Sequence, residues 1–204
     1  MPEDNNGLLR RMQKQIEFII EIDKVKSIIR KSRTFHNKRY ENDAEHGWHI
    51  SVMALVLAEY SNEKVDIAKV IKMALIHDLV EIDAGDTLLY AANRSDATEK
   101  ERQCAKRIFG ILPEDQYNQF MALWEEFEAK QTPEAKFAGV MDRLEPLLQN
   151  FYDNGHTWQK HNIPAEKVFR LNQQMEMGSK IIWDYARSII EESIKNGYLE
   201  RMNE

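Results

Sequence analysis

Apolar residues recur along the first 60 positions with the three- and four-residue spacing of an amphipathic α-helix. The spacing predicts one helix over residues 8 to about 31, followed by a basic and irregular segment, residues 31–40. Asn42 and Asp43 are both favourable N-cap residues, so they predict the start of a second helix that ends near residue 60. Its apolar stripe consists of His46, Ile50, Met53 and Leu57. His46 therefore occupies a core-facing position.

A third apolar stripe, with Asp66 as its N-cap, ends in ionisable residues. The stripe consists of Ile67, Val70, Ile71, Ala74 and Leu75. His77 and Asp78 continue this face from its two sides, and Glu81 lies one helical turn further on. Residues 84–87 then predict a turn. A polar loop at residues 91–95 leads to a charged helix that ends before Gly110.

The remaining helices are bounded by proline and glycine. Pro113 begins a helix that runs to about residue 130, and Pro133 begins the next one, in which Asp142 flanks an apolar stripe. Gly155 lies in a break, and Pro164 opens a last helical region with an interruption at Gly178. No strand is convincing. The pattern predicts an all-α fold of about seven or eight helices in a single domain, residues 1–204, with a core over about 15–150 and C-terminal helices over about 164–197.

Composition excludes several classes of protein. The chain has 204 residues, of which 43% are hydrophobic and 30% charged, as in ordinary globular proteins. The net charge of −6 disfavours binding to nucleic acid, although a small anionic ligand stays open because a local cation can override the global charge. Cys104 is the single cysteine, and neither a signal peptide nor an apolar run of the about 20 residues that a membrane span needs is present. We expect a soluble, cytoplasmic protein with no membrane association.

Four residues stand out as a candidate metal site: His46, the adjacent pair His77 and Asp78, and Asp142. Each lies at an end or a flank of an apolar helical stripe, where an unpaired ionisable side chain is costly to bury. Two imidazoles and two carboxylates suit one divalent cation, with Co, Mn, Fe, Ni and Zn all compatible. Taken singly, His46 could be a hydrogen-bonded core histidine and Asp142 a solvated aspartate. Together, one metal ion per chain explains all four.

The order of these residues on a helical scaffold resembles the HD-domain phosphohydrolase superfamily. Residues 41–49, around His46, are similar to the first-histidine segment of the branch that contains the 5'-deoxynucleotidases. Residues 72–86 are similar to its central signature, and residues 123–128 and 133–137 continue the likeness as far as residues 142–144. The resemblance covers roughly residues 15–195. It implies an HD-domain helical bundle, a small phosphoester substrate and a homodimer.

The positions of the six histidines narrow the subtype. They are residues 36, 46, 49, 77, 156 and 161, so none lies between Asp78 and Asp142. Relatives with two metal ions, including di-iron oxygenases and cyclic-dinucleotide phosphodiesterases, place additional histidine ligands in that interval. The sequence therefore favours a single metal ion and hydrolysis of a monoester, most simply a nucleoside or deoxynucleoside 5'-monophosphate.

Four further residues are candidates for the chemistry. A guanidinium suits the phosphoryl charge, and Arg33 in the basic segment is the candidate, with Arg30 among its competitors. Glu81 and Asp86 are the candidate proton donor and acceptor, in an order that the sequence leaves open. The resemblance implies the same roles for them. It also implies an aromatic residue after the arginine that crowds the ribose 2' position. Phe35 is the candidate, but its spacing and residue type depart from the pattern, which puts deoxy-selectivity in doubt.

Two functions remain open. The first is a metal-dependent 5'-nucleotidase or related phosphomonoesterase. The alternative is a non-catalytic, metal-stabilised module that senses a nucleotide or bridges subunits. Only the enzyme needs acidic residues beside the metal, so the presence of Glu81 and Asp86 favours it. Apolar residues of the last helices, such as Ile181, Ile182, Trp183 and Ile189, could either form a dimer interface or close the core.

Overall fold

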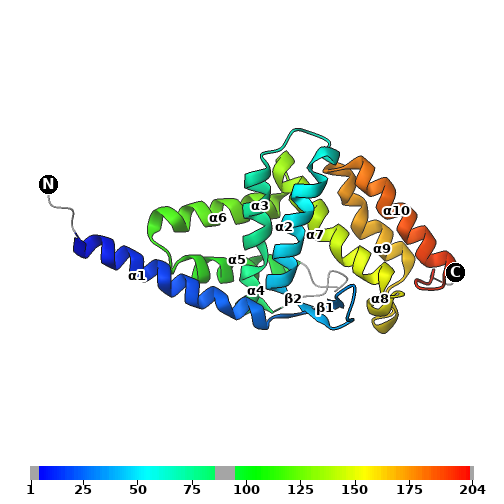
Figure 1. Ribbon diagram of the computed structural model, residues 1–204, viewed down its shortest axis with the longest axis horizontal. Helices are drawn as coiled ribbons and strands as arrows, with labels where there is room; N and C mark the ends of the chain where they lie inside the picture. The colour runs from blue at the N-terminus through cyan, green and yellow to red at the C-terminus, as the bar shows by residue number, and fades with distance from the viewer. Residues whose placement is uncertain (1–4, 86–94, 203–204) are drawn as a thin grey trace.

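The chain is almost entirely helical in the computed structural model, which describes residues 5–85 and 95–202 (Figure 1). Eight helices of eight residues or more occur in this part of the chain: α1 Asn5–Ile22, α2 Asp43–Leu57, α3 Ile67–Ile76, α5 Ser95–Phe109, α6 Glu114–Ala129, α7 Pro133–Tyr152, α9 Ala165–Asn172 and α10 Lys180–Lys195. Two helices are shorter, α4 (Glu81–Ala84) and α8 (His156–Lys160). Four 3₁₀ segments join them, η1 Asp23–Ser27, η2 Ala58–Tyr60, η3 His77–Val80 and η4 Gln173–Met177. The predicted helical bundle is confirmed.

The N-terminal prediction is wrong at its end. The helix predicted over residues 8–31 stops at Ile22, and after η1 the chain forms strand β1, Ile29–Arg33. This strand pairs antiparallel with β2, Tyr40–Asn42, so the segment expected to be irregular contains a small hairpin. Successive β-branched residues favour extended backbone, and Ile28 already has ψ 116°. Apolar spacing alone does not separate such a short segment from a helix.

Three predicted helix starts are confirmed by their caps. The Asn42 side chain accepts a hydrogen bond from the Glu45 backbone N–H, and the Glu45 carboxylate accepts one from the Asn42 backbone N–H, so a capping box opens α2. Asp66 accepts hydrogen bonds from two backbone N–H groups at the start of α3. Thr132 caps α7 with Pro133 as its first residue. These caps fix where the helices that carry His46, His77 and Asp142 begin.

The apolar core has two parts. The larger lies among α2, α3, α7 and the C-terminal helices, and the smaller among α1, α5, α6 and η3. Helix α3 contributes to both, because Met73 and Ala74 belong to the first part and Ile76 to the second. His77 follows directly, so its side chain is positioned where the two parts of the core meet. None of the helices in the described ranges is long and apolar enough to span a membrane.

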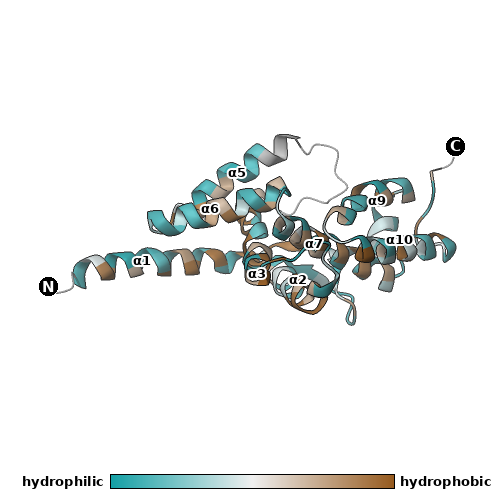
Figure 2. Cartoon of the chain, turned by 90° about the horizontal axis from the view of Figure 1, so that it is seen from above, coloured by the Kyte–Doolittle hydropathy of each residue, from teal (hydrophilic) through white to brown (hydrophobic). Residues whose placement is uncertain are grey.

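Helices α2 and α3 approach each other closely at Gly47. A Cβ atom on residue 47 would lie 3.3 Å from the carbonyl oxygen of Ala74, which is tighter than ordinary packing. A glycine therefore lets the two helix backbones come together next to His46. In Figures 1 and 2, α7 lies against both helices near the middle of the molecule.

We expect Asp66→Ala to lower the free energy of unfolding by about 1 kcal/mol, because it removes the side-chain oxygen that caps α3. Urea denaturation followed by circular dichroism measures this change. Asp184→Ala is the matched control, since Asp184 is an exposed aspartate within α10, and its effect should stay within about 0.5 kcal/mol. Equal stability of the two variants would contradict the capping role.

Candidate metal centre

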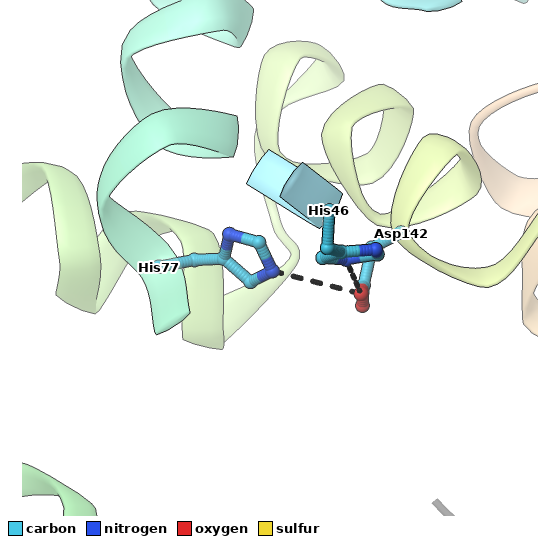
Figure 3. Close-up of side chains that lie close together, drawn as sticks. All are labelled: His46, His77 and Asp142. Atoms are coloured by element: carbon cyan, nitrogen blue, oxygen red, sulfur yellow. Dashed lines mark hydrogen bonds and ion pairs between the residues drawn. The ribbon is translucent and has the colours of Figure 1, made fainter. Parts of the chain in front are cut away.

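Three of the four predicted metal ligands converge from separate helices (Figure 3). His46 comes from α2, His77 from the junction of α3 and η3, and Asp142 from α7. Asp142 Oδ1 lies 3.3 Å from His46 Nε2 and 3.6 Å from His77 Nε2. One potential ligand atom from each of the three residues lies within 4.8 Å of the others. This spacing allows all three atoms to contact a single ion.

The fourth predicted ligand, Asp78, lies beside the other three. Its Oδ1 is 3.1 Å from His77 Nε2, and its Oδ2 is 3.8 Å from His46 Nε2. Oδ2 also accepts a hydrogen bond of 2.8 Å from Arg30. Asp78 therefore faces both imidazoles while Arg30 fixes one of its oxygens.

The hydrogen bonds of the two imidazoles fit a cation between them. His77 Nδ1 lies 2.9 Å from the Ala74 carbonyl oxygen, and His46 Nδ1 lies 3.3 Å from Glu145 Oε2. Both oxygens can only accept, so in each neutral ring Nδ1 carries the proton and Nε2 presents a lone pair. His77 Nε2 is buried and has no hydrogen-bond partner among the described residues. Two lone pairs that face carboxylate oxygens repel them unless positive charge lies between.

The pKa shifts of the two histidines and of Asp142 agree with this need for positive charge. Burial and the Arg30 charge lower the pKa of His46, but hydrogen bonds with Asp142 and Glu145 outweigh them and raise it to about 9. Burial also lowers the pKa of His77, which the carboxylates of Asp78 and Asp142 raise to about 10. The imidazoles in turn hold the pKa of Asp142 well below its usual range despite burial. The carboxylates therefore favour a cation at this position.

Arg30 is the arginine that contacts the cluster. Its guanidinium lies 2.8 Å from Asp78 and 3.1 Å from Asp43, and its Nε is 3.8 Å from Glu41. From the sequence, Arg30 was expected only as a competitor of Arg33 for the phosphate. Arg30 lies on strand β1, so the hairpin, which the sequence did not predict, brings its side chain to Asp78.

The predicted substrate-binding residues lie nearby but in other contacts. Arg33 Nε is 2.5 Å from Asp153 Oδ2. The Phe35 ring packs edge-on against His49, with 5.7 Å between centroids, and against Tyr152, with 5.9 Å. Neither contact tests the predicted role, so both assignments stay predictions.

Of the two predicted acidic catalysts, Glu81 lies in the part of the chain that the structure describes. Glu81 is the first residue of α4, directly after η3, and its side chain is one of the groups that affect the pKa of Asp43. Burial and the charge of Asp78 raise the pKa of Asp43 to about 6, although Arg30 and Glu81 oppose the rise. Glu81 therefore lies in a group of carboxyls and Arg30 beside the candidate ligands. Asp86 lies outside the described residues.

Sequence reasoning missed the buried groups behind His46. Glu145, Glu41 and Gln149 are all almost completely buried, and each belongs to a hydrogen-bonding group around the ring. The available signal was the spacing of Glu145 in α7, three residues after Asp142 and hence on the same helix face. A glutamate on a core-facing stripe requires a partner, as the candidate ligands do.

Comparison with known proteins identifies the family. Residues 22–183 match the HD domain. A solved structure from Magnetospirillum magnetotacticum MS-1, described as a predicted metal-dependent phosphohydrolase, is 48% identical, covers 93% of this chain and 96% of its own, and has a TM-score of 0.89.

Curated relatives are more distant. The human 5'-deoxynucleotidase HDDC2 is 29% identical over 66% of this chain and 65% of its own length, slightly less than two thirds of it. The Danio rerio protein of the same name is 31% identical over 68% of each chain. These names agree with the class of phosphohydrolase that the sequence predicted. The chain belongs to the HD-domain family.

Proposed function

We propose that this chain is a metal-dependent phosphohydrolase that removes phosphate from nucleoside 5'-monophosphates, deoxynucleotides among them. The observation that carries the proposal is the convergence of His46 Nε2, His77 Nε2 and an Asp142 oxygen beside a partly buried arginine, Arg30. Such a site combines metal ligands with a fixed positive charge for a phosphate group. The 5'-deoxynucleotidase name of the curated relatives supports this substrate class.

His46, His77, Asp78 and Asp142 are the proposed ligands of one divalent ion, with Co, Mn, Fe, Ni and Zn as candidates. When bound, the ion supplies Lewis acidity toward a phosphoryl oxygen and lowers the pKa of water. The four side chains hold it where two helices and a 3₁₀ turn meet. The helices that carry the ligands pack in the apolar core, and sites built on packed helices hold their side chains in defined positions.

Two arginines are candidates for the phosphate. Arg30 is favoured because its guanidinium is fixed beside Asp78 by ion pairs with two carboxylates, and a fixed positive charge stabilises the transferring phosphoryl group. Arg33 keeps the role proposed from the sequence if its ion pair with Asp153 opens when substrate binds. Arginine suits either position because its planar guanidinium contacts two phosphate oxygens at once.

Glu81 is the proposed proton-handling residue, together with Asp86. A nucleoside oxygen leaves as a poor alkoxide unless it receives a proton, so a carboxyl group beside the metal is needed. Glu81 lies next to Asp43, whose pKa burial and the Asp78 charge raise to about 6. A carboxyl group at this position is close enough to the proposed ligands to take part in proton transfer. Phe35 is the proposed contact for the sugar, where its ring lies against His49 and Tyr152.

Metal binding should depend on the proposed ligands. We expect His77→Ala and Asp142→Asn to lose most bound Mn²⁺ or Co²⁺ in isothermal titration calorimetry, because the first removes a nitrogen ligand and the second replaces an anionic ligand with a neutral amide. His161→Ala, which changes an exposed histidine, should bind metal like the natural chain. Apparent affinity should rise as the pH is raised toward 9, since protons compete for an imidazole whose pKa is about 9. Unchanged binding in both ligand variants would contradict the assignment.

Hydrolysis is tested by phosphate release from ribo- and deoxynucleoside 5'-monophosphates with several divalent metals. We expect metal-dependent release, and Glu81→Gln should reduce kcat by about 10²–10⁴-fold because proton transfer is lost. Glu191→Gln, at an exposed glutamate of α10, is the matched control and should be fully active. If metal binds but no monophosphate is turned over, the proposal fails and the non-catalytic sensing module takes its place.

The proposed homodimer has a different basis from the one that the sequence offered. Of the four last-helix residues that the sequence suggested for an interface, Ile182, Trp183 and Ile189 are buried in the core and Ile181 is exposed. Large exposed apolar side chains gather on α1 and α2 instead, where brown residues recur in Figure 2: Leu8, Leu9, Met12, Ile16, Ile19, Ile20, Trp48, Val52, Leu55 and Val56. Soluble chains cover such faces on association, and we propose a second copy as the partner.

Size-exclusion chromatography with light scattering tests this face. We expect the natural chain to have twice the monomer mass, and Leu55→Glu to be monomeric because a charge on the α2 surface would be buried in the dimer. Ile181→Glu places the same charge on exposed α10 and should remain dimeric. Dissociation by Ile181→Glu but not by Leu55→Glu would place the interface on the last helices.

A further inference from the structure

The side of His46 that faces away from the candidate ligands is closed by Glu145. This residue is 0% exposed and lies on α7, three residues after Asp142. Its Oε2 is 3.3 Å from His46 Nδ1, and its Oε1 is 3.2 Å from His49 Nδ1. Gln149 also donates a hydrogen bond to Oε1. Both oxygens of Glu145 are therefore engaged with neighbouring nitrogens.

Helix α7 thus contacts His46 at both ring nitrogens. Asp142 faces Nε2 on the side of the candidate metal, and Glu145 faces Nδ1 on the other side. A carboxylate only accepts hydrogen bonds, so Glu145 requires the proton of a neutral His46 to be on Nδ1. The lone pair of Nε2 is then directed toward Asp142. A ring rotated by half a turn would lose the Glu145 contact.

His77 obtains the same tautomer from a different group. Its Nδ1 lies 2.9 Å from the backbone carbonyl of Ala74. A backbone acceptor stays in place whatever the side chain is, whereas the acceptor for His46 can be removed by substitution. The two histidines thus provide an internal comparison within one site.

We propose that Glu145 is a positioning residue that fixes the tautomer and ring orientation of His46 as a metal ligand. This inference rests on the proposed metal site, and it concerns a residue behind the ligands rather than one that touches substrate. An acceptor on the far nitrogen of a ligating histidine raises metal affinity by orienting the ring and increasing its basicity. Gln149 supports Glu145, because its amide also donates 2.9 Å to Glu41 and so joins the two buried carboxyls.

A competing use of the same atoms is a second metal ion. Glu41, His46 and Glu145 also have potential ligand atoms within 4.8 Å of one another. An ion there would need the lone pair of Nδ1, which would move the proton to Nε2 and remove His46 from the first set. The positioning role and this second ion therefore make opposite predictions for the His46 tautomer.

The test compares Glu145→Gln and Glu145→Leu for Mn²⁺ affinity by isothermal titration calorimetry. Glutamine keeps an oxygen that can accept a hydrogen bond from Nδ1 of His46, so Glu145→Gln should lose less Mn²⁺ affinity than Glu145→Leu. Leucine has no acceptor and should weaken binding by about 10–100-fold. Glu192→Leu, on the exposed surface of α10, controls for loss of a glutamate and should bind as the natural chain does. If the Glu145→Leu variant binds Mn²⁺ as tightly as the natural chain does, the proposal is overturned.

Because Glu145→Leu could fail to fold, the tautomer of the natural chain is measured as well. Nitrogen-15 NMR of histidine-labelled protein with Zn²⁺ should show His46 protonated at Nδ1 and metal-bound at Nε2. Protonation at Nε2 would overturn the proposal in favour of an ion between Glu41 and Glu145. Impaired binding in Glu145→Leu without turnover of any monophosphate by the natural chain would leave the positioning role intact and reject the proposed activity.

Discussion

The buried charges around His46 constrain the rest of the structure. Five carboxyl groups, from Glu41, Asp43, Asp78, Asp142 and Glu145, face two imidazoles and the guanidinium of Arg30. Even with Glu41 and Asp43 protonated, the remaining carboxylates and Arg30 leave a net charge of −2 if the imidazoles are neutral. Buried charge of this size is costly unless it is compensated. A divalent cation at the two Nε2 atoms supplies the matching charge.

The fold brings these groups together through a few local features. Gly47 lets α2 approach α3 at the position of His46, and the caps at Asp66 and Thr132 set the starts of α3 and α7. Asp142 and Glu145 occupy one face of α7 at a spacing of three residues, so one helix contacts both nitrogens of His46. The hairpin adds Arg30 from β1 and Glu41 from β2. The site therefore depends on elements that are far apart in sequence.

Sequence reasoning was strongest where chemistry and periodicity coincide. His46, His77 and Asp142 each interrupt an apolar helical stripe, and their convergence could be predicted because a shared ligand resolves three burial costs at once. Helix starts were predictable because capping is local. The hairpin was missed because the apolar residues at 28 and 29 fit both a helix and a strand. Arg30 was placed behind Arg33 and Glu145 was missed for a related reason, since their partners lie 48 and 99 residues away in the sequence. The spacing of Glu145 from Asp142 indicates a shared helix face, but the tertiary fold is needed to show that His46 lies against it.

The most direct test of this account is the position of a bound ion. A crystal of the natural chain grown with Mn²⁺, with diffraction data collected at the manganese absorption edge, gives an anomalous difference map that locates the metal without assumptions about its ligands. The account predicts one peak per chain in contact with His46 Nε2, His77 Nε2 and an Asp142 oxygen, at distances of about 2.0–2.2 Å. A peak between Glu41 and Glu145 at His46 Nδ1, or none at either place, would contradict it.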